Sequence, residues 1–258
     1  MPELDPRLQA AVLRLDPIGD RDEYSELVAL VEGVESLSIE RLERLSAEGG
    51  EAARRLVARA HNLGLPRWGI WTGAEGHSLS ADLKTDQRCL VVDLGSLSTQ
   101  DEQALAAAFV LSELWKRRAE REPVLIVVDA HNICPAKPAD PLTAIATERA
   151  VRIAAEGRKF GLLLLVSTQR PQKVHENVIS QCDNLLLMRM NSLADLAFAG
   201  DVFSLVPPSV LNRATDFSQG EFLAAGVFAS HPAFVRIGSR ITAEGGGDVP
   251  SDWARPRS

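Results

Sequence analysis

Two polar residues, each at the end of an apolar run, are the side chains of this sequence best suited to chemistry. Asp129 ends the run at residues 123–129 (PVLIVVD), and Gln169 follows the run at residues 161–167 (GLLLLVS). Ligands in open parallel sheets bind beyond the carboxyl ends of the strands. A carboxylate there can orient Mg²⁺ or its water ligands, and a polar side chain on a neighbouring strand can orient water against a phosphate. The two residues together predict chemistry on a phosphate group.

Each of these features also has a purely structural explanation. An aspartate at the start of a loop can cap the following turn, and Pro171 alone accounts for a turn after the second run. The basic segment at residues 156–161 (EGRKFG) suits the C-terminus of a helix, where cations are favoured and Gly161 is a natural cap. The functional alternative is that Arg158 is an arginine finger that reaches a nucleotide in the neighbouring subunit.

The elements that must position these residues form an alternating pattern, from residue 67 to residue 190. Short apolar runs alternate with helical spacing, which predicts crossover connections and a mostly parallel sheet with flanking helices. Thr99 and Glu102 form a capping-box pattern at the start of one helix. The fold class is therefore α/β, with strands predicted at residues 88–93, 123–129, 161–167 and 184–190 and helices at 99–118 and 143–158.

The flanking regions complete the predicted organisation. Helical spacing of apolar residues over 20–63 predicts an α-helical N-terminal segment. The region after residue 190 contains residues 195–203 and a break at Pro207-Pro208, and it predicts a short helix near residues 210–214 and two late strands, at residues 220–229 and 233–237. The last residues are rich in glycine, proline, serine and charge, which predicts a flexible tail. We therefore expect three parts: a helical segment (1–66), the core (67–240) and the tail (241–258).

Charge and composition exclude several classes of protein. The formal net charge is −7, whereas a generic DNA-binding module is basic, although a ring-shaped motor with a few basic loops facing a central pore remains open. The N-terminus has no apolar stretch typical of a signal peptide. The longest apolar run, residues 162–166, is far shorter than the roughly 20 residues that span a bilayer. We expect a cytoplasmic protein without a membrane segment.

The cysteines and histidines do not form a metal-binding pattern. Cys89, Cys134 and Cys182 are odd in number and widely spaced, so we expect small core residues in a reducing compartment. His131 and His175 have no third ligand at a suitable spacing. A metal site built on histidine or cysteine is not expected.

The ordered segments together resemble the HerA-type ATPases of the HerA/FtsK branch. The resemblance is carried by PVLIVVDAHNICPAKPADP and by TERAVRIAAEGRKFGLLLLVSTQRPQKVHENVISQCDNLLLMRM, and it spans about residues 88–237. It implies the distal part of a RecA-like P-loop core in a hexameric ATPase that uses ATP and Mg²⁺ to move along or unwind DNA. It also implies roles for three residues: Asp129 faces Mg²⁺ through water or faces the attacking water, Gln169 senses the γ-phosphate, and Arg158 serves the adjacent subunit. Lys159 and Arg170 are alternatives for that last role.

The first departure from the family pattern concerns phosphate binding. No GxxxxGK[ST] loop occurs anywhere in the sequence, and the glycine-rich residues 69–76 (GIWTGAEG) contain no lysine. The backbone amides and the lysine of that loop hold the phosphates in this class of enzyme. We therefore expect the chain to be truncated, split into two polypeptides or degenerate.

The second departure concerns the acidic motif. The family usually has Asp-Glu-Ala-His where this chain has Val128-Asp129-Ala130-His131. We place Asp129 at the glutamate position and Val128 at the aspartate position, because a deletion within a buried strand would move its side chains to the opposite faces. Losing one acidic group lowers general-base catalysis by roughly 10²–10⁴-fold.

These departures leave three interpretations. The chain binds and hydrolyses ATP only when the phosphate loop comes from elsewhere, either within a homo-oligomeric ring or from a complementary chain that carries the loop. Alternatively, it is a catalytically inactive pseudo-ATPase subunit, or a truncated gene fragment.

Overall fold

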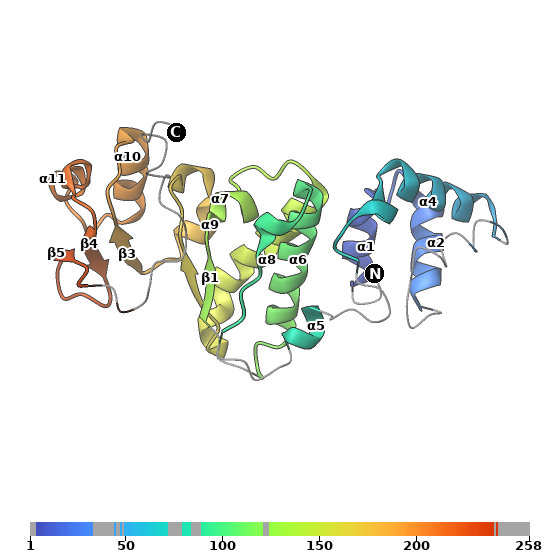
Figure 1. Cartoon of the computed structure of the whole chain (residues 1–258), viewed down its shortest axis with the longest axis horizontal. Helices are drawn as coiled ribbons and strands as arrows, with labels where there is room; N and C mark the ends of the chain where they lie inside the picture. Colours follow the sequence, from blue (N-terminus) through green and yellow to red (C-terminus); the bar gives the residue numbers. More distant parts are fainter. Residues whose placement is uncertain are drawn as a thin grey trace, which may run out of the picture. The chain divides into compact units, whose positions relative to one another are not determined.

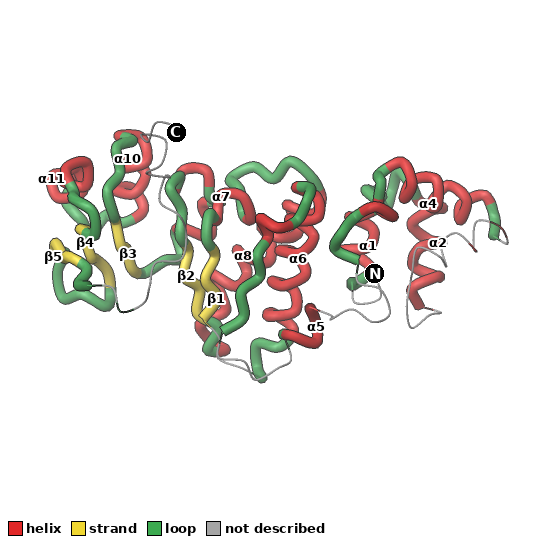
Figure 2. Tube along the Cα trace, viewed as in Figure 1, coloured by secondary structure: helices red, strands yellow, loops and turns green. Residues whose placement is uncertain are grey.

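The computed structural model describes residues 4–32, 44, 47, 49–71, 79–83, 89–120, 124–239 and 241. The chain forms two compact units, Met1–Asp183 and Asn184–Ser258. Figure 1 labels the helices and strands of both units, and Figure 2 distinguishes helix, strand and loop along the same trace. The predicted boundaries at residues 66 and 240 remain predictions, and the predicted tail lies almost wholly outside the described residues.

The N-terminal part of the first unit is helical, as the spacing of its apolar residues predicts. It contains α1 (Pro6–Val12), α2 (Arg21–Glu32) and α4 (Glu51–Asn62), followed by the 3₁₀ turn η1 (Leu65–Arg67). Helix α4 begins after Gly50, and the chain leaves it through Gly64, whose φ of 70° is left-handed and suits glycine. The helix buries one face, made of Ala53, Leu56, Val57 and Ala60.

Helices α6 (Gln100–Lys116) and α8 (Pro141–Glu156) lie side by side and form the framework of the first unit (Figure 1). Thr99 and Glu102 make the predicted capping box at the start of α6. The Glu102 carboxylate is almost wholly buried and also accepts a hydrogen bond from the Gly69 backbone amide. Helix α1 packs on both helices, and the Arg7 guanidinium donates to the Glu148 carboxylate of α8, with Nη1 3.0 Å from Oε1. Burial of each large apolar side chain in this core contributes about 1.5–3 kcal/mol.

Short helical segments connect the longer elements of this unit. They are α5 (Leu79–Asp82), η2 (Leu94–Ser96), α7 (Ala130–Ile133), η3 (Gly157–Phe160), η4 (Pro171–Lys173) and α9 (Glu176–Ile179). Gly157 opens η3 in a tight space, because a Cβ at this position would lie 2.6 Å from the Leu162 carbonyl oxygen. Gly161 ends η3 with a φ of 74°, which confirms it as a cap.

Strands β1 (Val124–Val127) and β2 (Leu163–Val166) pair in parallel, with Val127 opposite Val166, and α8 lies on the connection between them. Val127 and Leu162 are buried toward the helices, and α8 contacts β2. The opposite face of the pair is open. Its four large apolar side chains, here called the outer apolar face, are 45–63% exposed: Ile126, Val128, Leu163 and Leu165. A parallel sheet is normally covered on both faces, so this open face is unusual.

The second unit contains an antiparallel sheet in the order β3-β4-β5, made of β3 (Asn184–Leu187), β4 (Glu221–Gly226) and β5 (Ala233–Arg236). Helices α10 (Leu193–Val202) and α11 (Pro208–Leu211) and the turn η5 (Asn212–Asp216) lie between β3 and β4 in the chain. Leu187 and Leu223 face each other in the register and are buried. Both late strands and the short helix near residues 210–214 are thus confirmed, with small shifts at their ends, whereas α10 was not predicted.

Two expectations are corrected. The apolar run at residues 88–93 forms no strand over its described part, 89–93, where Val91 is 80% exposed. The sheet is not mostly parallel, because only β1 and β2 are parallel while β3 pairs antiparallel with β4. Both errors have one cause: an apolar run favours an extended conformation, but pairing depends on which neighbouring strand is present.

The cysteines and the helices settle two further expectations. Cys134 is buried as expected, and burial raises the pKa of its thiol to about 12, with a smaller contribution from Cys182. Cys89 is exposed, so its assignment to the core is wrong, because the segment around it forms no buried strand. Among the described helices, none has both the length and the apolar composition that crossing a bilayer requires.

Candidate functional site

The segments that carry Asp129 and Gln169 lie next to each other at the carboxyl edge of the parallel pair. The Ser167 amide donates to the Val127 carbonyl over 2.8 Å, and the Ala130 amide donates to the Ser167 carbonyl over 3.1 Å. These two bonds continue the ladder of β1 and β2 beyond the strands and into both loops. The sheet therefore places both loops at one edge, where parallel sheets bind ligands.

Asp129 has a left-handed backbone, with φ 50° and ψ 46°. It directly precedes α7, yet its carboxylate caps no backbone amide of that helix and is exposed. This conformation costs roughly 1–2 kcal/mol for most residues, although aspartate and asparagine adopt it more readily than others. The carboxylate is therefore free to contact a ligand at this edge, and the predicted capping role is not what the structure shows.

A side-chain contact that the sequence pattern did not predict joins the two loops. His131 Nδ1 lies 3.2 Å from Thr168 Oγ1, and the same hydroxyl accepts a hydrogen bond from the Arg170 amide over 3.0 Å. The sequence feature that could have predicted this contact is the position of the two residues. His131 lies two residues after Asp129, and Thr168 lies directly before Gln169. Sequence reasoning considered His131 only as a metal ligand.

Gln169 and Val128 are both exposed at this edge. The Gln169 side chain points into no buried site, so its sensing role remains a prediction. Val128 is a large apolar side chain with 63% of its surface exposed, immediately after β1. The alignment of Val128 with a family aspartate remains a prediction.

Arg158 lies at the opposite edge of the sheet. It belongs to η3, which precedes β2, whereas Asp129 and Gln169 follow β1 and β2. A four-residue strand is roughly 13 Å long. The Arg158 guanidinium is 82% exposed and forms an ion pair with Asp183 at 3.2 Å. The structure does not bring Arg158 to the Asp129 edge of its own chain. Lys159 shares its position at the amino edge, while Arg170 lies at the carboxyl edge.

The two loops pair again further along the chain. The Ala136 amide donates to the Lys173 carbonyl over 2.8 Å, and the His175 amide donates to the Cys134 carbonyl over 2.9 Å. Pro135 and Val174 form an antiparallel bridge between these bonds. The loops that follow β1 and β2 are therefore held as one short ribbon above the carboxyl edge.

The residues at this edge fit a nucleotide only in part. Asp129 can contribute one oxygen to Mg²⁺, which proteins often hold with one or two carboxylates together with phosphates and water. Segments 128–140 and 167–175 contain no glycine, so they offer no glycine-rich backbone cradle for the phosphates. Within the described part of the chain, no group of three or more histidine, cysteine or acidic residues could hold a metal.

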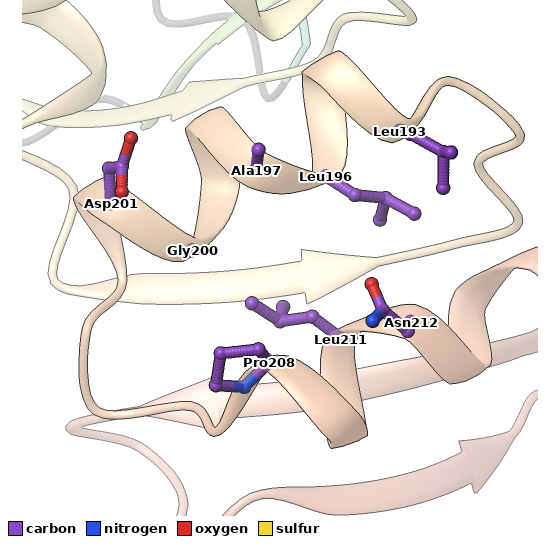
Figure 3. Close-up of a pocket in the computed structure, with 8 residues that line it drawn as sticks. All are labelled: Leu193, Leu196, Ala197, Gly200, Asp201, Pro208, Leu211 and Asn212. Carbon is purple, nitrogen blue, oxygen red and sulfur yellow. The ribbon is translucent and has the colours of Figure 1, made fainter.

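A separate groove lies in the second unit, between α10 and α11 (Figure 3). Its volume is about 380 Å³. Most of its lining is apolar, and the eight residues are Leu193, Leu196, Ala197, Gly200, Asp201, Pro208, Leu211 and Asn212. No lysine or arginine lines it, so it offers no cation to a phosphate.

Comparison with known proteins supports the expected relationship over part of the chain. The chain is 27% identical over 155 residues to the DNA double-strand break repair helicase HerA of Sulfurisphaera tokodaii, a match that covers 57% of this chain and 31% of that protein. It is 25% identical over 177 residues to HerA of Sulfolobus acidocaldarius, covering 65% and 35%. The matched region therefore spans about a third of the length of these curated relatives. No protein-family model matches the chain.

A solved structure shows the same fold over most of the chain. VirB4 of Thermoanaerobacter pseudethanolicus matches with a TM-score of 0.57 at 16% sequence identity, covering 92% of this chain and 68% of that one. The chain therefore has a mixed α/β fold that resembles that of VirB4.

Proposed function

We propose, on the premise that part of this chain is a distant homologue of HerA helicases, that it supplies one half of an ATP site in a DNA-acting ATPase. Its half is the carboxyl edge of β1 and β2. The other half is a segment with a GxxxxGK[ST] loop, provided by another polypeptide or by another part of the assembly. ATP and Mg²⁺ bind, and ATP is hydrolysed, only when both halves are together.

The observation that carries this proposal is the direct joining of the two loops that follow β1 and β2. Their backbone bonds set Asp129 beside the segment that carries Gln169. Asp129 then faces Mg²⁺ or the attacking water, and Gln169 orients the γ-phosphate. The left-handed backbone of Asp129 adds support, because strained conformations gather at functional sites.

The outer apolar face supports the second half of the proposal. A two-stranded parallel pair with 45–63% exposure of Ile126, Val128, Leu163 and Leu165 lacks the cover that such sheets have in other proteins. A further strand and helix packed there would bury these side chains. The polypeptide segment with the phosphate loop is the cover we propose.

Arg158 has a role only between subunits. Because it lies at the amino edge, it serves the ATP site of a neighbouring chain, as a finger that stabilises the phosphates. That role requires a homo-oligomer, and the proposed assembly is a ring of six on DNA in the cytoplasm. Its ion pair with Asp183 is exposed on both sides and is therefore weak enough to exchange for a phosphate.

One observation favours a second candidate function, that of a non-catalytic subunit. Only one carboxylate stands at the edge, since Val128 occupies the place of the second. Such a chain would retain Arg158 and the interface while activating no water itself. A truncated gene fragment is the third possibility, and the outer apolar face is what such a fragment would expose.

Phosphate release on mixing tests the proposal. The full chain is combined with the product of the reading frame directly upstream, if that product carries a GxxxxGK[ST] loop, and Mg·ATP hydrolysis is followed with and without DNA. Activity that appears only in the mixture, and that Asp129→Asn lowers by roughly 10²-fold or more, supports the split site. Activity that Asp129→Asn leaves unchanged would contradict the assignment of Asp129.

The control arm uses this chain alone. Without the phosphate loop it is expected to bind no Mg·ATP at micromolar concentration. Isothermal titration calorimetry measures this directly, and tight binding by the isolated chain would show that the site is not split. No activity in the mixture favours the non-catalytic subunit.

A further inference from the structure

The imidazole of His131 has one ring nitrogen engaged within the fold. Nδ1 lies 3.2 Å from the Thr168 hydroxyl, in the contact that joins the two loops. The side chain is half-buried, and no hydrogen bond within the described part of the chain involves Nε2. The two ring nitrogens face different directions, so a partner of Nε2 would come from outside the loop contact. The chemistry that His131 offers to such a partner depends on whether Nε2 carries a proton.

The Thr168 hydroxyl determines the direction of its bond to His131. Its Oγ1 accepts a hydrogen bond from the Arg170 amide over 3.0 Å. A hydroxyl also has one proton to donate, and His131 Nδ1 is an acceptor within its reach. The opposite direction would place two N–H donors on Oγ1 and turn the hydroxyl proton away from Nδ1. Thr168 therefore donates to Nδ1, which leaves the single proton of the neutral ring on Nε2.

The backbone holds both partners of this bond in place. The Ala130 amide donates to the Ser167 carbonyl over 3.1 Å, so the residues directly before His131 and Thr168 are themselves joined. Ala130 is wholly buried at the start of α7. The fold thus keeps the imidazole and the hydroxyl opposite each other before any ligand binds.

We infer that Thr168 holds His131 as the tautomer with its proton on Nε2, so that His131 donates a hydrogen bond to an oxygen of the ligand at the carboxyl edge. A neutral ring in this form has no lone pair at Nε2, so His131 is not the base that takes a proton from the attacking water. It orients an acceptor oxygen, and Thr168 is a positioning residue that acts through it. The choice of a phosphate oxygen as the acceptor rests on the proposed function, whereas the tautomer rests on two hydrogen bonds of this chain.

Nitrogen NMR of the isotope-labelled full chain tests the tautomer without any ATPase partner. Long-range proton–nitrogen correlation spectra distinguish a protonated ring nitrogen from an unprotonated one, and at about pH 8.5 histidine rings are neutral. His131→Gln removes the His131 signals and so assigns them. The expected result is a protonated Nε2 and an unprotonated Nδ1 in His131.

Thr168→Val is the test variant, because it removes the donor to Nδ1. Both nitrogen signals of His131 should then shift toward those of a free imidazole, which exchanges between the two tautomers. Thr168→Ser keeps the hydroxyl and should retain the original signals. His175 is the internal control, assigned with His175→Gln, because its Nδ1 accepts from the Asn177 amide over 3.3 Å and that bond does not involve Thr168. The His175 signals should be the same in all three proteins.

Inorganic phosphate tests the role of His131 toward a ligand. Phosphate is added at millimolar concentrations to the full chain, and chloride at matched ionic strength is the control. The His131 ring signals should shift with phosphate and not with chloride, and those of His175 should stay in place. In Thr168→Val the shift should be smaller, because the ring is no longer held with Nε2 as the donor.

Three outcomes would overturn the inference. A His131 ring protonated on Nδ1 would reverse the direction of the bond to Thr168. Unchanged His131 signals in Thr168→Val would remove Thr168 as the cause of the tautomer. Phosphate-dependent shifts that are absent, or that are equal for His131 and His175, would remove His131 as a donor to this ligand. The split ATP site is judged separately by phosphate release on mixing, so either proposal can fail while the other stands.

Discussion

His131 Nδ1 lies 3.2 Å from Thr168 Oγ1, across the space between the loops that follow two parallel strands. The imidazole and the hydroxyl thus add a side-chain link to the backbone bonds at Ser167. Both residues neighbour the positions proposed for chemistry. The contact therefore links the loop that carries Asp129 to the loop that carries Gln169.

The first prediction concerns the energy of this contact. His131→Ala and Thr168→Val should each lower the free energy of unfolding, by about 0.5–1.5 kcal/mol for each hydrogen bond removed. His131→Ala removes one such bond, whereas Thr168→Val removes two, because the Thr168 hydroxyl also accepts from the Arg170 amide. The double variant should lose less than the sum, and urea unfolding of all four proteins gives the coupling. Thr99→Val is the matched control, because the Thr99 hydroxyl bonds to Glu102 and not to His131 or Thr168. Additive losses for His131 with Thr168 would show that the contact is absent in solution.

The second prediction uses the left-handed backbone of Asp129. Asp129→Asn should change the unfolding free energy by less than about 0.5 kcal/mol, since asparagine tolerates this conformation. Asp129→Val should cost about 1–2 kcal/mol, because a β-branched side chain is strained at φ 50°. Denaturant titrations compare the two variants. Equal stabilities for Asn and Val would mean that the backbone relaxes at this position, and Asn is the variant suited to activity measurements.

The third prediction concerns Gly157 in the EGRKFG segment. A Cβ there would meet the Leu162 carbonyl oxygen at 2.6 Å, so Gly157→Ala should lower the free energy of unfolding by about 1–3 kcal/mol. Gly50→Ala is the control, since a methyl group at that position would meet no atom within 4 Å and the φ of Gly50 is −67°. Thermal unfolding of both variants measures the difference. A Gly157→Ala protein as stable as Gly50→Ala would contradict the close approach.

The fourth prediction concerns the outer apolar face. The double variant L163K/L165K should bind a hydrophobic dye less than the original chain and should self-associate less in sedimentation, because both side chains are about half exposed on one face. Ile18→Lys is the control, since Ile18 is 89% exposed but lies in the helical N-terminal part. Unchanged dye binding in the double variant, or a reduction matched by Ile18→Lys, would remove this face as the main apolar surface.

The fifth prediction concerns pH. The hydrogen bond from Arg7 holds the pKa of Glu148 below its usual value. A lowered carboxyl pKa stabilises the fold above the unfolded value of about 4.3, and that contribution is lost as pH falls through the folded value. Glu148→Gln should therefore cost about 0.2–1 kcal/mol at neutral pH, a range suited to an exposed pair, and nothing near pH 3. Urea titrations at neutral pH and near pH 3 measure both costs, and an equal cost at the two pH values would contradict the ion pair as its source.

Local signals predicted the helices well. The capping box at Thr99 and the glycine at position 161 mark ends that depend on a few neighbouring residues, and both are confirmed. Strand pairing depends on distant partners instead. The run at 88–93 has the composition of a buried strand, yet Val91 is exposed and unpaired within the described residues. The same dependence explains why the antiparallel pairing of β3 was missed.

The candidate site likewise has one part that the sequence predicted and one part that it did not. The carboxyl edge that carries Asp129 and Gln169 follows from two apolar runs and the topology of a parallel pair, so the sequence was sufficient to predict it. The His131–Thr168 contact depends on how two loops fold above that edge, which no spacing rule describes. The pairing of residues 134–136 with 173–175 could not be predicted from the sequence for the same reason.

Arg158 and Asp129 stand at opposite ends of the parallel pair, and this separation restricts how copies of the chain could meet. If the arginine of one copy completes the site of the next, the contact joins two unlike surfaces, so one copy keeps its site unused and the other keeps its arginine unused. Such head-to-tail contacts repeat until the rotation per step closes a circle, or else they grow into an open filament.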